Sequence, residues 1–125
     1  MNKINKKSKD YSRQLTEMVA NAALLKNAED VNILNMKKKV SFTDYFVICQ
    51  GDNKMQIKAI ADKIIEELEK ADIKDFNIEG YDNKEWILID IYDVICHIFD
   101  EKTRKYYDIE NLWADVPQET INDVK

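Results

Sequence analysis

The chain has 125 residues, of which 45% are hydrophobic and 34% are charged, and its formal net charge is −5. This length and composition predict one globular domain that folds around its own core without disulfides or structural metals. They exclude a membrane-spanning helix, because no apolar run approaches the roughly 18 residues that a span requires.

We expect three segments along the chain: a basic arm over residues 1–14, a folded domain over 15–116 and a flexible tail over 117–125. The arm is rich in lysine, but it lacks the apolar core and the cleavage site of a secretory signal. We therefore expect a cytoplasmic protein.

A helix is predicted to start near Ser8 or Asp10, at the end of the arm, and to run into the folded domain as far as about Asn27. Its apolar residues recur at helical spacing, which is typical of a helix with one buried face. These residues are Leu15, Met18, Val19, Ala22 and Leu25.

Two strands and a second helix follow. The apolar runs 31–36 and 45–50 predict the strands, and Gly51 ends the second of them. Asn53 is placed to cap the next helix, with Gln56 three residues later completing a pair that resembles a capping box. That helix runs to about Ala71, because its apolar residues keep a spacing of three and four.

The last part of the domain is predicted to hold three strands and a short helix. Residues 76–79 form the first of these strands, and Gly80 ends it. The runs 86–89 and 94–99 are apolar and β-branched, and they flank a polar break, which predicts a buried β-hairpin. Asp100 then caps a short helix that ends at Tyr107, and a final turn covers 109–113.

This order of elements predicts an α/β or α+β domain with a mixed, five-stranded sheet and helices packed on it. The strand–helix–strand unit from Tyr45 to Ile78 is expected to be a right-handed crossover that joins parallel strands.

Charge is distributed unevenly along the chain. Residues 1–39 carry nine basic and four acidic side chains, whereas residues 40–125 carry ten basic and twenty acidic ones. The acidic body would repel a nucleic-acid backbone, so it favours a basic protein as partner. The lysine-rich arm is either a solvated tail or a weak phosphate contact.

Two features resemble catalytic sites, but each also has a purely structural interpretation. Gly51 to Lys54 lie where a strand meets a helix N-terminus; with one glycine and an acidic Asp52, an ordinary helix cap is favoured over a phosphate cradle. His97 lies in the middle of a strand, where a structural histidine is favoured over a general base paired with Asp90 or Asp93.

The two cysteines, Cys49 and Cys96, lie inside apolar strands. They are interpreted as small buried residues that stay reduced, although a disulfide between neighbouring strands is also open. Two cysteines and one histidine make no metal set, because Cys96 and the adjacent His97 point to opposite faces of a strand.

The hairpin also predicts a docking surface. Trp86 lies at the solvent end of one strand, and Ile91 and Tyr92 fall in the turn, where little core is available to bury them. Exposed apolar groups rimmed by carboxylates favour a protein contact over a catalytic pocket. Core burial of Trp86 is the alternative.

A series of motifs, in this order, resembles the ribosomal silencing factor family, also called Iojap or RsfS. The resemblance extends from about Leu15 to Trp113. Its motifs are Thr43 to Ile48, Ala59 to Asp62, Glu79 to Tyr81, Trp86 to Asp90, Asp93 to Phe99, Arg104 to Tyr107, and Leu112 with Trp113.

The resemblance implies a fold similar to nucleotidyltransferases but without their catalytic carboxylates. It implies a protein without enzymatic activity, cofactor or metal, which binds the large ribosomal subunit through large-subunit ribosomal protein fourteen. By occupying the face that meets the small subunit, such a protein blocks subunit joining and represses translation. We expect no direct DNA contact, no membrane partner, and either a monomer or a homodimer.

The resemblance also implies partner-binding residues. The family's contact tryptophan matches Trp86, its contact leucine matches Ile91, and its acidic residue after the turn matches Asp93. Tyr81 and Tyr92 complete the predicted site. Tyr92 stands where the family usually has glycine, so it either adopts a costly positive φ or forces a different turn.

Two other functions remain open. Organellar relatives assist assembly of the large subunit, so an assembly factor is one alternative. The other is a residual nucleotidyltransferase that holds a metal with Asp44, Asp90 and Asp93.

Overall fold

A computed structural model describes residue 4 and residues 7–122 of the chain. The rest of the basic arm and residues 123–125 lie outside the described residues. The elements follow the order α1 (Tyr11–Leu25), β1 (Glu29–Asn35), β2 (Tyr45–Gly51), α2 (Lys54–Lys70), β3 (Asn77–Glu79), β4 (Trp86–Asp90), β5 (Val94–Asp100), α3 (Glu101–Tyr107), α4 (Ile109–Leu112) and β6 (Gln118–Ile121).

The strands form one mixed sheet in the order β3-β4-β5-β2-β1-β6. β2 and β5 are parallel, and every other neighbouring pair is antiparallel. The mixed α+β architecture is thus confirmed. β2 and β3 point the same way, as predicted, but β4 and β5 lie between them in the sheet.

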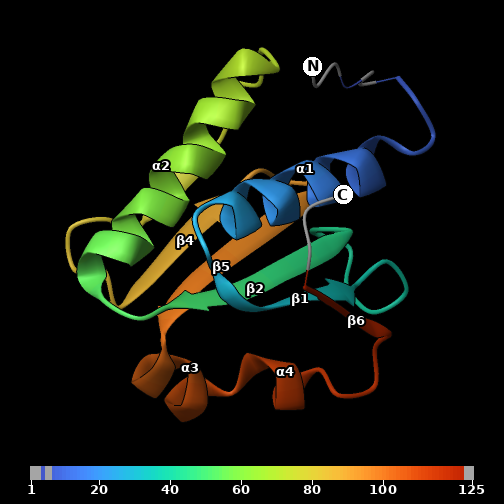
Figure 1. The fold of residues 1–125 in the computed structure, drawn as a ribbon. Coiled ribbons are helices and arrows are strands. Elements are labelled where there is room, and N and C mark those ends of the chain that lie inside the picture. Colours follow the sequence, from blue (N-terminus) through green and yellow to red (C-terminus); the bar gives the residue numbers. More distant parts are fainter. Residues whose placement is uncertain (1–3, 5–6, 123–125) are drawn as a thin grey trace.

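Helices cover the two faces of the sheet to different extents. α1 and α2 lie across one face, whereas the short α3 and α4 lie on the opposite side (Figure 1). The larger core fills the first interface with apolar residues from every second position of the strands, among them Val47, Ile87 and Cys96. A smaller core around Phe46, Ile48 and Phe99 lies on the second face.

The helices α2 and α3 are capped by the residues that the sequence predicts, Asn53 and Asp100. The Asn53 side chain accepts a hydrogen bond from the Gln56 backbone N–H (2.9 Å), and the Gln56 side chain accepts one from the Asp52 N–H (2.6 Å). Asp100 likewise accepts from the Thr103 N–H (2.7 Å) at the start of α3. These bonds satisfy amide groups that a helix leaves open at its first turn, which explains the Gly51–Lys54 segment as a cap.

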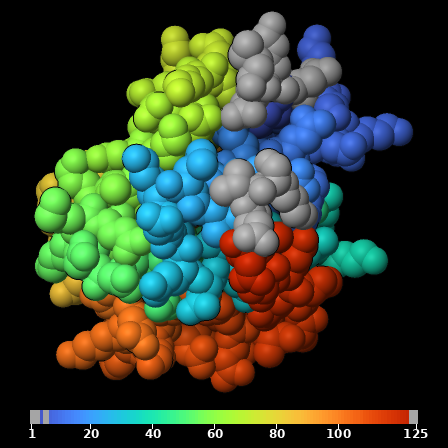
Figure 2. Space-filling view, viewed as in Figure 1, coloured from blue at the N-terminus to red at the C-terminus, as the bar shows by residue number. Residues whose placement is uncertain are grey.

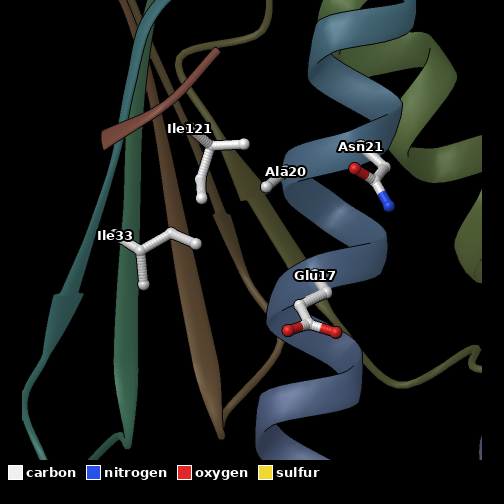
Figure 3. Close-up of a pocket in the computed structure, with 5 residues that line it drawn as sticks. All are labelled: Glu17, Ala20, Asn21, Ile33 and Ile121. Atoms are coloured by element: carbon white, nitrogen blue, oxygen red, sulfur yellow. The ribbon is translucent and has the colours of Figure 1, made fainter. Parts of the chain in front are cut away.

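The prediction of a frayed tail was wrong for Gln118 to Ile121, which form a sixth strand beside β1. Ile121 and Ile33 point toward Ala20 of α1 (Figure 3), and Ile121 is buried. Arg13 adds an ion pair with Glu119 at 3.0 Å. The hollow beside these residues measures about 10 Å³, room for one water molecule, and is therefore no ligand site.

In the described part of the chain, no helix combines the length and the apolarity needed to cross a bilayer.

Candidate functional site: a docking surface on β4

Trp86 opens β4 on the face opposite α1 and α2. Its indole ring lies 4.9 Å from the ring of Phe99 and 4.7 Å from that of Tyr107, centroid to centroid. The indole N–H donates a hydrogen bond to Nδ1 of His97 (3.1 Å). The ring is partly buried against the smaller core and partly exposed, so the core and surface interpretations both hold in part.

His97 is a structural residue. Only 4% of its surface is exposed, and burial lowers its pKa to about 4. The ring is therefore neutral at pH 7, and since Nδ1 accepts from Trp86, its proton resides on Nε2, which has no hydrogen-bond partner among the described residues. His97 bonds Trp86 rather than a carboxylate, and this arrangement fixes the indole instead of preparing a general base.

The prediction that Ile91 is exposed was wrong. Its side chain is 4% exposed and belongs to the larger core. The cause is strand alternation: Ile87 and Ile89 point inward, and Ile91 continues that period of two into the turn. A hydrogen bond from the Ile91 N–H to the Val94 carbonyl (2.9 Å) holds it there.

Tyr92 adopts the positive φ that the family glycine implied. Its φ is +67°, a left-handed conformation that costs a side chain about 1 kcal/mol or more. The Asp90 side chain supports the turn by accepting a hydrogen bond from the Tyr92 N–H (2.9 Å). The Tyr92 ring is 49% exposed, so the turn presents an aromatic group to solvent.

Asp93 is the last residue of the turn and lies beside Asp44, which directly precedes β2. Its carbonyl accepts hydrogen bonds from the N–H groups of Asp44 (2.9 Å) and Tyr45 (3.2 Å). Burial raises the pKa of the Asp93 carboxyl, and the Asp44 carboxylate raises it further. The described residues contain no group of three or more His, Cys, Asp or Glu that could hold a metal ion, so Asp44, Asp90 and Asp93 do not form one.

Tyr81 lies on the other side of the sheet, against α2. Its hydroxyl donates a hydrogen bond to the Asp62 carboxylate (2.6 Å). The Nζ atoms of Lys58 and Lys84 lie 5.8 and 5.5 Å from the centroid of its ring, in cation–π contact. Burial alone would raise the pKa of Asp62, but the hydrogen bonds from Lys58 and Tyr81 lower it. Tyr81 is thus held within a local network.

The predicted site residues therefore do not form one patch. Trp86 opens one end of β4, while Tyr92 and Asp93 lie beyond its other end, and five strand residues span roughly 16 Å. Ile91 supports the turn from within, and Tyr81 lies beside α2.

Sequence reasoning missed the surface between these ends. Leu88 and Asp90 share a face with Trp86 and are partly exposed. Their register partners on β3, Glu79 and Asn77, are exposed. We call these five side chains the β3–β4 face. The alternation along β4 was the signal that could have revealed it.

The two cysteines are free and buried, as expected. Interaction with the neighbouring Cys49 thiol, together with burial, raises the pKa of the Cys96 thiol well above its ordinary value. A raised pKa keeps the buried Cys96 thiol protonated, so it is not activated for nucleophilic chemistry.

Comparison with known proteins gives one consistent result. Residues 9–125 match the family model described as ribosomal silencing factor during starvation. A relative named ribosomal silencing factor RsfS, from Halalkalibacterium halodurans, is 38% identical over 106 residues, covering 85% of this chain and 91% of that protein. A crystal structure of a Bacillus halodurans protein superimposes with a TM-score of 0.77 at 35% identity, over 87% of this chain and 99% of the other.

A more distant relative is the mouse protein named mitochondrial assembly of ribosomal large subunit protein 1. It is 25% identical over 101 residues, which cover 78% of this chain but 44% of the mouse protein. The bacterial relatives carry the name of a regulator that acts on the ribosome, not of an enzyme. The chain belongs to the ribosomal silencing factor family.

Proposed function

We propose that this protein binds the large ribosomal subunit through large-subunit ribosomal protein fourteen and blocks the small subunit from joining. The block is steric: residence on the joining face suffices, and no reaction is required. Translation falls because occupied large subunits cannot enter initiation. Such a role places the protein in the cytoplasm.

The observation that carries the proposal is the partly exposed Trp86 on an acidic surface. Residues 77–113 contain nine acidic and four basic side chains, a net charge of −5. A basic ribosomal protein complements this charge, which speeds encounter and makes binding sensitive to salt. An aromatic ring that is already fixed loses little freedom on binding, so it suits an interface anchor.

The predicted contact residues differ in their part in this proposal. Trp86 is the central anchor, and Tyr92 and Asp93 contact the partner at the far rim. Ile91, which is buried, acts indirectly by holding the turn. Tyr81 lies on the other side of the sheet, against α2, so the proposal gives it no contact with the partner.

The first experiment is sedimentation of purified large subunits with wild-type protein and with Trp86→Ala. We expect the variant to bind roughly 30-fold more weakly, as for loss of a buried aromatic anchor. Met55→Ala is the matched control, because Met55 is 84% exposed on α2, across the sheet from Trp86. Wild-type affinity in a folded Trp86→Ala variant would refute the assigned surface.

A second experiment addresses the partner and the block. Purified ribosomal protein fourteen should bind the full chain directly, and the chain should slow the joining of purified subunits measured by light scattering. Joining at an unchanged rate with saturated large subunits would exclude the steric mechanism.

An assembly factor is the second candidate, and the name of the mouse relative favours it. The two roles would use the same surface at different times. A deletion strain separates them: accumulation of immature large particles in growing cells indicates assembly, whereas normal particles with excess subunit joining in starved cells indicate silencing.

A further inference from the structure

Two tyrosines at the end of α3 present their rings to solvent. Tyr106 is 80% exposed and Tyr107 is 51% exposed. The helix α3, which carries both, lies on the side of the sheet opposite α1 and α2 (Figure 1), and together with α4 it forms the lower edge of the molecule (Figure 2).

These rings continue the aromatic cluster of Trp86. The Tyr107 ring lies 4.7 Å from the Trp86 ring, and the Tyr106 ring packs edge-on against Tyr107 at 5.0 Å. Further inward, Phe99 and His97 contact the indole. A partner that reaches the exposed part of Trp86 must therefore also meet Tyr107.

The helix that carries the tyrosines is held firmly. Two nitrogens of Arg104 donate to the two carboxylate oxygens of Glu110, at 3.0 and 2.6 Å, and a third donates to Gln50 of β2 (3.2 Å). Burial alone would raise the pKa of Glu110, but the hydrogen bonds from Arg104 and Asn32 lower it. The tyrosine rings are thus presented from a fixed backbone, as good interface anchors are.

The groove beside the rings is balanced in charge. Glu85 and Asp100 line it together with Lys102 and Lys105, and Lys105 also pairs with Glu101 at 3.0 Å. Because these lysines already neutralise the nearby carboxylates, most of the binding free energy of an incoming side chain should come from contact with the faces of the tyrosine rings. A guanidinium group stacks well on tyrosine and tryptophan faces.

We propose that Tyr106 and Tyr107 form a second half of the docking surface and receive arginine side chains of the same basic ribosomal protein that contacts Trp86. The inference rests on the proposed function and extends it to α3. The groove itself is balanced in charge, but the segment of residues 77–113 that carries both Trp86 and the tyrosines has a net charge of −5, which favours a cationic protein over RNA as the occupant of the whole surface.

The test measures the affinity of the full-length protein for purified large subunits with Tyr106→Ala, Tyr106→Phe and the control Met55→Ala. Tyr106→Ala should weaken binding roughly tenfold, and Tyr106→Phe should retain wild-type affinity because the ring face remains. The dependence of Kd on salt should not change, since no charge is removed. Thermal unfolding should match the wild type, because the Tyr106 side chain is exposed.

Two results would overturn the inference. Wild-type affinity of Tyr106→Ala, while Trp86→Ala loses binding, would refute the role of α3 and leave the proposed function intact. Equal losses for Tyr106→Phe and Tyr106→Ala would assign the contact to the hydroxyl and refute ring stacking. If neither Trp86→Ala nor Tyr106→Ala weakens binding, the whole docking surface assigned here is refuted, whereas failure of the wild-type protein to bind large subunits would refute the proposed function itself.

A photoreactive benzoylphenylalanine placed at position 106 identifies the partner class. On purified large subunits we expect a crosslink to a ribosomal protein. A crosslink to ribosomal RNA would contradict the proposed occupant.

Discussion

The residues of β4 alternate between two faces of the sheet that differ in their cover. Ile87 and Ile89 point under α1 and α2 and are fully buried, whereas Trp86 and Leu88 point to the other face and stay partly exposed. The face that carries Ile87 and Ile89 is covered by the long amphipathic helices α1 and α2. The face that carries Trp86 and Leu88 is covered only in part, by the short α3 and α4. Neighbouring residues of one strand can therefore serve stability and binding separately.

Two truncations at adjacent residues of β4 should have opposite consequences for stability and binding. Ile87→Ala should lower the free energy of unfolding by about 3 kcal/mol, because it leaves a cavity in the larger core. Leu88→Ala should cost about 1 kcal/mol or less, yet weaken binding to large subunits. Chemical denaturation and sedimentation measure the two effects, and equal destabilisation by both variants would abolish the distinction.

The second face also holds a group that titrates. Burial lowers the pKa of folded His97 to about 4, below the ordinary 6.5, so the unfolded chain binds more protons as pH falls. The stability gained from keeping this ring neutral is complete above pH 6.5 and is lost as pH approaches 4. Between pH 7.5 and pH 5 this loss should reach about 2 kcal/mol.

His97→Gln tests that effect, because His97 is the only histidine in the chain. The variant should unfold with a flatter pH dependence between pH 7.5 and pH 5. An unchanged slope would show that other groups cause the loss.

The smallest expected effect concerns the turn at the far end of β4. Tyr92→Gly removes a side chain from a left-handed conformation, which should raise the free energy of unfolding by up to about 1 kcal/mol. If Tyr92 also contacts the partner, binding should weaken while stability rises. A higher melting temperature together with a weaker affinity would show that the Tyr92 ring contacts the partner. A lower melting temperature would refute the argument that Tyr92 strains the turn.

Local pattern was enough to predict most of the sheet. The apolar runs of β1, β2, β4 and β5 and the spacing in α1 and α2 appear directly in the sequence. β6 was missed because three of its four residues are exposed and it has no alternation of its own; its position depends on pairing with β1. Edge strands of this kind are defined by their neighbour more than by their composition.

The site was harder to predict than the fold. The sequence identified Trp86 correctly as partly exposed. Ile91 was expected in a solvent-exposed turn, but the alternation of inward-pointing residues along β4 continues to Ile91 and buries it. Similarly, no local pattern brings Tyr107 next to Trp86, because that contact depends on how Arg104 and Glu110 anchor α3. Which side chains meet across elements is decided by tertiary packing.

The hydrogen bond between Trp86 and His97 gives the molecule an internal probe. The indole N–H has a fixed acceptor, so its NMR resonance should be sharp and well separated. The second tryptophan, Trp113, packs partly buried elsewhere in the smaller core and supplies an unperturbed reference. Occupancy of the surface can thus be followed in unlabelled or isotope-labelled native protein, without attaching a dye to the face under study.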